Sequence, residues 1–317
     1  MNIVVLDGYA ANPGDISWEP LQRLGKLTVY DRTAREDIAG RIEGAEIVLT
    51  NKAPLDRETL AGAKALKLVS VLATGYNIVD TAAARELGIA VCNVPGYSTM
   101  SVAQLTFALL LEITHRVGLH SDAIHDGAWV RSPDFAYWQS PLMELDGKVM
   151  GIVGGGTIGM AVARIAAAFG MRVLATSRSR RTGSDGAVTF VPLEDLLRRS
   201  DVISLHCPLT DETKNLIRTE TIAQMKDGVI LLNTARGPIV NEADLAVALA
   251  SGKVGAAGID VLSAEPMRAD NPLLGAKRCF LTPHIGWAPC EARVRLMNET
   301  VRNVEAYLAG ELIHRVN

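Results

Sequence analysis

Short apolar runs alternate with helix-length amphipathic segments along almost the whole chain. This alternation is typical of a parallel β-sheet whose faces are covered by helices. In the first part of the sequence it predicts strands near residues 3–6, 47–49, 68–72 and 90–92. Between and after these strands it predicts helices near residues 17–24, 57–63, 81–86 and 101–115.

A second series of apolar runs begins near residue 148. It predicts strands near residues 148–153, 173–175, 202–205, 229–232, 255–259 and 280–282. The segment between the two series, residues 116–146, is irregular and rich in aromatic residues, among them Trp129, Phe135 and Trp138. An exposed aromatic segment marks a partner surface in some proteins and packs on its own domain in others, and the sequence leaves both interpretations open.

Length and composition indicate an ordinary globular protein. The 317 residues exceed the usual size of one compact core, so the two series predict two α/β domains, each with a doubly wound parallel sheet. Hydrophobic residues make up 48% of the chain and charged residues 21%, which excludes a disordered or fibrous protein. The formal charge of −3 gives no electrostatic footprint for nucleic acid or for an anionic membrane surface.

The four cysteines are scattered, without a CxxC pair and without metal-ligand spacing. They predict neither a disulfide framework nor a metal site, and they suit a reducing compartment. The apolar run at residues 3–6 reads as a strand rather than a signal peptide. No stretch reaches the roughly 18 apolar residues that a membrane span requires. We therefore expect a cytoplasmic protein without a membrane or nucleic-acid partner.

A GxGxxG sequence occupies residues 154–159 and consists of Gly154, Gly155, Gly156, Thr157, Ile158 and Gly159. It follows one predicted strand and opens a predicted helix over residues 160–169, which is the context of a dinucleotide-binding turn. Gly154 permits the tight turn, Gly156 lets the backbone approach a pyrophosphate, and Gly159 lets the helix lie close to the strand. The helix N-terminus offers amides and a partial positive charge to the phosphates. The turn therefore predicts a Rossmann-type cofactor domain.

The end of the next strand bears on the choice of cofactor. An acidic residue usually stands there when the cofactor lacks a 2′-phosphate. This chain instead has Ser177 and Arg178, followed by Arg180. Hydroxyl and guanidinium groups hold a 2′-phosphate through charge-assisted hydrogen bonds, whereas a carboxylate repels it. The sequence favours NADP(H) and leaves NAD(H) open, with Ser177 and Arg178 as first contacts and Arg180 in support. The competing interpretation is a solvated basic loop.

Three segments with reactive side chains, at residues 233–237, 258–266 and 282–287, lie near the carboxyl ends of predicted strands, where ligands bind in open α/β sheets. Reduction of a 2-oxo acid needs a cation for the substrate oxygens and a proton donor beside the carbonyl. Arg236 suits the first task, and His284 suits the second. Glu265 is expected to orient the imidazole and to stabilise the imidazolium, and Asp260 to accept a hydrogen bond from the nicotinamide carboxamide. Each residue alone also fits a structural role, but together they predict an active site.

With the glycine-rich turn, these segments resemble the D-isomer-specific 2-hydroxyacid dehydrogenase family over essentially the whole chain. The resemblance implies that Arg236, Glu265 and His284 are catalytic. It also implies a substrate loop at residues 73–77, preceded by residues 67–69 and followed by Asp80, and the backbone amides of this loop would hold the substrate carboxylate. A further loop at residues 206–210 would border the adenosine. The expected substrate contacts are Lys52, Thr74, Gly75, Tyr76, Arg236, His284 and Trp138. The expected cofactor contacts are Gly154, Gly156, Thr157, Ile158, Gly159, Ser177, Arg178, Cys207, Pro208, Thr234, Asp260 and Gly286.

Within the family, the N-terminal half is most similar to glycerate dehydrogenases, also called hydroxypyruvate reductases, through residues 50–55 and 135–138. This finer resemblance implies a homodimer in which Trp138 reaches the active site of the neighbouring subunit. The family further implies a discontinuous, flavodoxin-like substrate domain of residues 1–98 and 288–317. Residues 99–287 would form the cofactor domain, with a cleft between the two domains.

These expectations describe an oxidoreductase that reduces hydroxypyruvate, glyoxylate or a similar 2-oxo acid to a D-2-hydroxy acid with NADP(H). One alternative is a phosphite or other acid dehydrogenase of the same superfamily. Formate is disfavoured, because the resemblance would then imply Gln in place of Glu265. Another alternative is a cofactor-sensing binding protein similar to the C-terminal-binding protein corepressors, since fold alone does not fix function.

Overall fold

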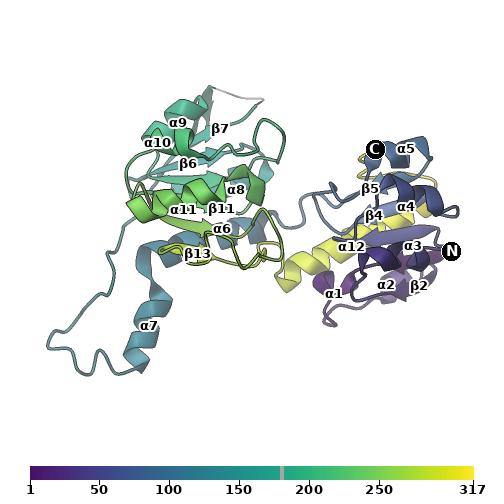
Figure 1. Cartoon of the computed structure of the whole chain (residues 1–317), viewed down its shortest axis with the longest axis horizontal. Helices are drawn as coiled ribbons and strands as arrows, with labels where there is room; N and C mark the ends of the chain where they lie inside the picture. The colour runs from purple at the N-terminus through teal and green to yellow at the C-terminus, as the bar shows by residue number, and fades with distance from the viewer. Residues whose placement is uncertain (179–181) are drawn as a thin grey trace. The chain divides into compact units, whose positions relative to one another are not determined.

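The computed structural model describes residues 1–178 and 182–317 (Figure 1). The chain divides into two compact units. Unit 1 consists of Met1–Ser98 and Ala288–Asn317, and unit 2 consists of Thr99–Trp287. The chain therefore leaves unit 1 after Ser98 and returns to it at Ala288. The assignment of unit 1 to substrate and unit 2 to cofactor stays a prediction.

Unit 1 contains a parallel sheet with the strand order β2-β1-β3-β4-β5. Its strands are β1 (Asn2–Val5), β2 (Lys26–Val29), β3 (Ile47–Thr50), β4 (Leu68–Val71) and β5 (Ala90–Cys92). Every residue of β3, β4 and β5 is buried, as in a parallel sheet covered on both faces. The helical segments are α1 (Gly8–Ala11), α2 (Glu19–Gln22), η1 (Arg35–Asp37), α3 (Ile38–Arg41), α4 (Arg57–Gly62), α5 (Thr81–Glu86) and α12 (Cys290–Leu308).

The C-terminal helix α12 belongs to unit 1, although it is made after all of unit 2. It packs against β4 and buries Leu296 and Val304 on its apolar face. Beyond the helix, Val316 donates its backbone N–H to the carbonyl of Val91 at 2.8 Å, and Arg315 pairs antiparallel with Cys92. The last residues of the chain therefore pair with β5 and extend the sheet of unit 1.

Unit 2 contains a sheet with the strand order β13-β12-β11-β10-β6-β7-β9-β8, parallel except for the β8–β9 pair. The strands are β6 (Val149–Val153), β7 (Arg172–Thr176), β8 (Gly183–Asp185), β9 (Val188–Phe190), β10 (Val202–Leu205), β11 (Val229–Asn233), β12 (Val254–Ile259) and β13 (Cys279–Leu281). The helical segments are α6 (Thr99–His115), α7 (Val117–His125), α8 (Thr157–Ala168), α9 (Leu193–Arg199), α10 (Thr219–Ala223), η2 (Gly237–Ile239) and α11 (Glu242–Ser251).

Each face of the unit 2 sheet has its own hydrophobic core. Successive side chains of a strand point to opposite faces, so Met150 and Ile152 of β6 join one core while Val149 and Val153 join the other. The first core includes side chains of α6 and α8, and the second includes side chains of α9, α10 and α11. Helices on both faces leave the carboxyl ends of the strands as the edge where loops can form a site.

The structure confirms the α/β class with parallel sheets, and each predicted strand lies within one residue of its predicted bounds. The prediction that residues 116–146 are irregular is wrong at its start, because residues 117–125 form α7. The pattern also missed β2, β8 and β9, which are short strands at or near the sheet edges and carry exposed residues. The helix expected over residues 17–24 is shorter, at Glu19–Gln22.

Among the described residues, no single helix has both the length and the apolar composition to cross a membrane. Helices α6 and α7 meet that test only as a pair, by length and composition, and the pair is bent by 57°. Most of the apolar side chains of α6 belong to the first core of unit 2.

Candidate active site

The three segments predicted to carry the chemistry meet at one edge of the unit 2 sheet. They follow β11, β12 and β13, which are parallel neighbours, so their carboxyl ends lie side by side. Backbone hydrogen bonds continue past the strand ends, from the N–H of Asp260 to Asn233 at 2.9 Å and from the N–H of Thr282 to Ile259 at 3.0 Å. Arg236, Glu265 and His284 therefore stand on loops that leave the same edge.

His284 and Glu265 form a hydrogen-bonded pair at this edge. The Nδ1 atom of His284 lies 2.7 Å from Oε2 of Glu265, and the two side chains are 25% and 33% exposed. The other oxygen of Glu265 accepts the backbone N–H of Leu262 at 3.1 Å. A carboxylate on Nδ1 fixes the ring orientation and favours the tautomer with a proton on that nitrogen. The Nε2 atom is then the one that can exchange a proton with a bound substrate.

Asp260 anchors the loop that carries His284. The residue is buried, with 2% of its surface exposed. Its carboxylate accepts hydrogen bonds from the Thr282 hydroxyl at 2.6 Å and from the backbone N–H groups of Ile285 and Gly286 at 2.8 and 2.9 Å. Burial raises the pKa of Asp260, and these hydrogen bonds oppose that rise. The predicted hydrogen bond from Asp260 to a nicotinamide carboxamide stays a prediction.

The backbone of His284 is left-handed, with φ of 55°. A histidine in this region is uncommon, and such conformations persist where the surrounding structure fixes them. Here the His284 N–H donates to the carbonyls of Asp260 at 2.8 Å and Thr282 at 3.0 Å. Asp260 therefore fixes the left-handed backbone of His284 through its carbonyl, and it fixes the backbone amides of Ile285 and Gly286 through its carboxylate.

Arg236 follows β11 on a short loop that is fixed by Asn233. The Asn233 side chain donates to the carbonyl of Arg236 at 3.0 Å and accepts the N–H of Ala235 at 3.0 Å. The guanidinium donates to the carbonyl of Ala235 at 2.7 Å, and within the described residues it forms no ion pair. A partly exposed guanidinium without a carboxylate partner is suited to an anionic ligand.

Gly237 brings the Arg236 loop against the loop that carries Glu265. A Cβ atom added at Gly237 would lie 1.9 Å from the carbonyl carbon of Leu262 and 2.4 Å from the backbone nitrogen of Ser263. No side chain fits at that separation. The absence of a side chain at Gly237 lets the backbones of the Arg236 loop and the Glu265 loop touch.

The glycine-rich turn has the form that a dinucleotide requires. Gly154 has φ of 109°, and a Cβ there would lie 2.5 Å from the backbone nitrogen of Cys207. A Cβ at Gly159 would lie 2.0 Å from the carbonyl oxygen of Gly154, whereas a Cβ at Gly156 would have no atom of residues 1–178 or 182–317 within 4 Å. Gly156 is also the N-cap of α8. The open space at the helix N-terminus therefore fits a phosphate group.

The predicted cofactor contacts surround this turn. Ser177 lies beside it, since a Cβ added at Gly155 would be 3.4 Å from the Cβ of Ser177. Arg178 is exposed on the same loop, and Arg180 lies outside the described residues. Thr234 is buried, with its hydroxyl 3.1 Å from that of Thr106. Contacts of these residues with a cofactor, and those predicted for Thr157, Ile158, Cys207, Pro208 and Gly286, stay predictions.

The predicted substrate loop lies in unit 1, after β4. The Thr74 hydroxyl donates to the carbonyl of Val94 at 2.9 Å, and Tyr76 is exposed. Lys52 stands on a neighbouring loop whose backbone is held by an aspartate that sequence reasoning missed. The carboxylate of Asp7 accepts the N–H groups of Asn51 at 2.8 Å and Ala53 at 3.0 Å, as well as that of Lys52. Contact of these residues, and of Gly75, with a substrate stays a prediction.

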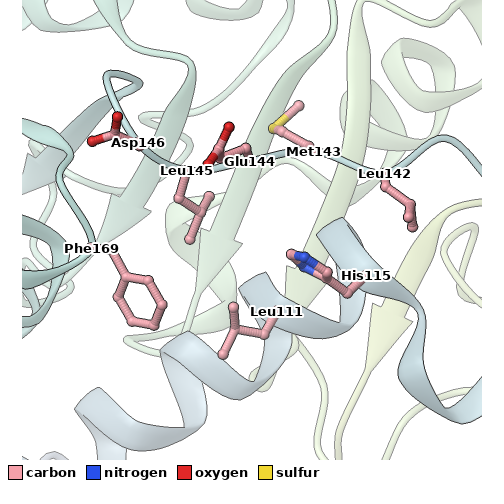
Figure 2. Close-up of a pocket in the computed structure, with 8 residues that line it drawn as sticks. All are labelled: Leu111, His115, Leu142, Met143, Glu144, Leu145, Asp146 and Phe169. Carbon is pink, nitrogen blue, oxygen red and sulfur yellow. The ribbon is translucent and has the colours of Figure 1, made fainter.

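A pocket of about 590 Å³ lies in unit 2, and none of the predicted site residues lines it. Figure 2 shows Leu111 and His115 on one helix, with residues 142–146 crossing beside them. The lining residues are Leu111, His115, Leu142, Met143, Glu144, Leu145, Asp146 and Phe169. Among the described residues, no group of three or more His, Cys, Asp or Glu side chains could hold a metal ion.

Comparisons with known proteins agree with this geometry. Residues 107–286 match the model of the "D-isomer specific 2-hydroxyacid dehydrogenase, NAD binding domain" family. A hydroxypyruvate reductase of Blautia hydrogenotrophica is 52% identical over 321 residues, covering 100% of both chains. A solved structure of a protein from Thermus thermophilus has a TM-score of 0.87 at 36% identity and covers 100% of both chains. An acyclic imino acid reductase in complex with NADPH and D-Arg has a TM-score of 0.88 at 27% identity, again over 100% of both chains.

Proposed function

This chain belongs to the D-isomer-specific 2-hydroxyacid dehydrogenase family and is an NAD(P)-dependent 2-oxo acid reductase, and from that premise we propose that hydroxypyruvate and glyoxylate are its substrates and NADPH its preferred reductant. The pair of His284 and Glu265 beside the Arg236 loop carries the proposal. His284 offers a proton donor and Arg236 a cation, both at the carboxyl edge of a parallel sheet, where such sites form. The similarity to a hydroxypyruvate reductase supports the choice of substrate.

The catalytic residues act on a small anionic carbonyl compound. The guanidinium of Arg236 binds the substrate carboxylate and polarises the carbonyl oxygen, as a planar fork can do with two oxygens. The bound nicotinamide supplies the hydride that reduces C2. His284 donates the proton from Nε2 to the oxygen as negative charge develops there. Glu265, on Nδ1, stabilises the imidazolium before that transfer and orients the ring during it.

We propose further that unit 1 supplies the remaining substrate contacts. Thr74, Gly75 and Tyr76 would offer backbone amides to the carboxylate, and Lys52 would add a cationic side chain. Asp7 supports this role of Lys52, because its carboxylate accepts the backbone N–H groups of Asn51 and Ala53 on either side of the lysine. Unit 2 would hold the cofactor, in agreement with the residues that match the NAD binding domain model.

The decisive experiment is a panel of 2-oxo acids assayed with NADPH and NADH in parallel. Rapid oxidation of NADPH with hydroxypyruvate or glyoxylate is the expected result. Strong preference for another acid would change the substrate, and negligible turnover with every acid would contradict a reductase. Negligible turnover with retained NADPH binding is the result expected of a cofactor-sensing protein.

Preference for NADPH is tested at Ser177, which lies against the glycine-rich turn. In Ser177→Asp we expect kcat/KM for NADPH to fall about 10- to 100-fold, because a hydrogen bond to a charged group contributes about 1.5–3 kcal/mol. Activity with NADH should hold or rise, since a carboxylate can accept from the ribose hydroxyl. An equal fall with both cofactors would mean that Ser177 does not read the 2′-phosphate.

We also propose that the active molecule is a homodimer formed through α7 and the residues that follow it. This segment reaches away from the sheet of unit 2 in Figure 1. It exposes apolar side chains, with Val130 at 91% and Phe135 at 92%, and Trp138 is exposed beside them. Exposed apolar surface on this scale marks an interaction site. Trp138 would then border the substrate site of the second copy.

A further inference from the structure

The loop that carries Glu265 has limited support from the hydrophobic core, against which its side chains Leu262 and Met267 pack while partly buried. It runs between two buried residues, Val261 at 2% and Leu273 at 1% exposure. None of residues 262–272 between them is buried. A loop of this length with few core contacts is loosely held unless hydrogen bonds add to them. Polar contacts therefore contribute, together with Leu262 and Met267, to the position of the Glu265 carboxylate against His284.

Glu242 supplies two such contacts. It is the first residue of α11 and follows the N-cap Asn241. One carboxylate oxygen accepts the backbone N–H of Ser263 at 2.6 Å, and the other accepts the Nδ2 amide of Asn271 at 2.7 Å. Ser263 lies two residues before Glu265, and Asn271 lies near the far end of the loop. The Glu242 carboxylate therefore spans the segment that presents Glu265.

Glu242 is also connected to Arg236, the third proposed catalytic residue. Glu242 stands on the chain that continues from Arg236 through η2 into α11. Gly237, at the start of that chain, already lies against the backbone of Leu262 and Ser263. Backbone contact at Gly237 and the two hydrogen bonds of Glu242 thus join the Arg236 segment to the Glu265 loop at separate points.

We propose that Glu242 is a positioning residue for the reduction, which holds Glu265 within hydrogen-bond reach of His284 by accepting from Ser263 and Asn271. The proposal rests on the proposed function, because it assigns Glu242 to the proton-donating pair. A carboxylate in the first turn of a helix also stabilises the helix dipole, and this would be a purely structural role. Asp244 is the matched control, since it stands in the same first turn and accepts the N–H of Thr219 at 2.8 Å, away from the catalytic loop.

The test compares Glu242→Gln with Asp244→Asn. Gln keeps the shape of the side chain and replaces one acceptor oxygen by a donor, so one of the two loop contacts is lost. We expect kcat to fall about 10- to 100-fold, as misplacement of a catalytic group by about 1 Å can do. KM for the acid and Kd for NADPH should stay within about twofold of wild type, since Glu242 is expected to contact neither ligand. Asp244→Asn should lower the melting temperature at least as much and leave kcat unchanged.

A swap of donor and acceptor provides rescue. Asn271→Asp alone places two carboxylates face to face and should also lower kcat. In the double variant Glu242→Gln with Asn271→Asp, the new amide donates to the new carboxylate, and most of the kcat should return. In a Glu265→Ala background, Glu242→Gln should cause no further loss of kcat. Failure of the rescue, or a further loss in that background, would overturn the proposal.

A readout without turnover separates this proposal from the proposed function. Histidine labelled with ¹⁵N in the ring reports the hydrogen bond between Nδ1 of His284 and Glu265 by NMR. The Nδ1 proton signal, assigned by its loss in His284→Ala, should be sharp in wild type and broadened or lost in Glu242→Gln, but unchanged in Asp244→Asn. A wild type that reduces no 2-oxo acid would contradict the proposed function, whereas an unchanged signal in Glu242→Gln would contradict only the role of Glu242.

Discussion

His284 combines two unusual properties at one residue. Its backbone is left-handed, and its Nδ1 atom is hydrogen-bonded to the carboxylate of Glu265. Both follow from neighbours that are remote in sequence, because Asp260 holds the loop amides and the loop after β12 brings the glutamate. The side chain is therefore oriented before any ligand binds, as preorganised catalysis requires.

Replacement of this imidazole tests the proton-transfer assignment. In His284→Ala we expect kcat to fall about 10²- to 10⁴-fold, the usual contribution of a general acid. Kd for NADPH, measured by fluorescence titration, should change little, because the glycine-rich turn lies at the N-terminus of α8 and not on the loop that carries His284. Turnover close to the wild-type rate would show that another group donates the proton.

His206 gives a pH dependence of stability that is separate from catalysis. Desolvation by the surrounding protein lowers the pKa of His206 from 6.5 to about 4, and its Nε2 lies 2.8 Å from the Ser204 hydroxyl. The unfolded chain keeps the ordinary pKa, so between these values it binds more protons than the folded protein. The free energy of unfolding therefore falls as the pH falls through this window.

The expected size of this effect near pH 5 is about 2 kcal/mol relative to neutral pH. Urea unfolding of wild type and His206→Gln at the two pH values provides the measurement. The variant should be less stable at neutral pH but should lose about 2 kcal/mol less on acidification. An equal loss in both proteins would mean that other groups cause the acid sensitivity.

That Arg236, Glu265 and His284 meet at one edge of the unit 2 sheet was predictable from the sequence, whereas the residues that hold their loops in place were not. Arg236, Glu265 and His284 stand out because each follows a recognisable strand and belongs to a known set of segments. Asp7, Glu242 and the anchoring role of Asp260 left no such signal. Their partners are mainly backbone amides of distant segments, and any residue type supplies an amide. Only the folded chain reveals which carboxylate they reach.

At the level of elements, the glycine-rich turn separates requirements of folding from requirements of binding. Gly159 is needed by the fold, because a Cβ there would lie 2.0 Å from the carbonyl oxygen of Gly154. Gly156 has an ordinary extended backbone, and no described residue would contact a side chain there, so the described part of the fold does not demand a glycine. The remaining explanation for a glycine at that position is a ligand that approaches the helix N-terminus closely.

Two alanine variants make this distinction measurable. Gly156→Ala should keep the melting temperature of the wild type within a few degrees and weaken NADPH binding by at least tenfold, because the methyl group occupies the phosphate space. Gly159→Ala should lower the melting temperature or fail to fold, since a helix and a strand must separate to admit it. Normal cofactor affinity in Gly156→Ala would place the phosphates elsewhere.

Elements with strong apolar patterns were predicted well, and weakly patterned ones were not. Strands such as β6 and β11 are buried along their whole length and appear in the sequence as continuous apolar runs. In contrast, all three residues of β8 are exposed, and α7 has no buried residue. An exposed element lacks the periodic burial that a sequence pattern records, so its existence depends on contacts that the pattern does not contain.

At the scale of the whole molecule, the exposed segment after α7 predicts the oligomeric state. Wild type should sediment as a dimer at micromolar concentration, and Phe135→Glu should shift it toward the monomer, because a charge would be buried in the proposed interface. Val247→Glu is the matched control, since Val247 is an exposed valine on α11. A wild-type monomer, or equal behaviour of both variants, would contradict the dimer.

The path of the chain through the two units sets the order in which a ribosome can complete them. Residues 1–98 emerge before unit 2, yet the helix that packs against β4 and the residues that pair with β5 emerge after it. Unit 2 is continuous in sequence, and all of its strands precede residues 288–317. During synthesis unit 2 can therefore be completed before unit 1, whose strand β4 lacks the packing of α12 until residues 290–308 have been made.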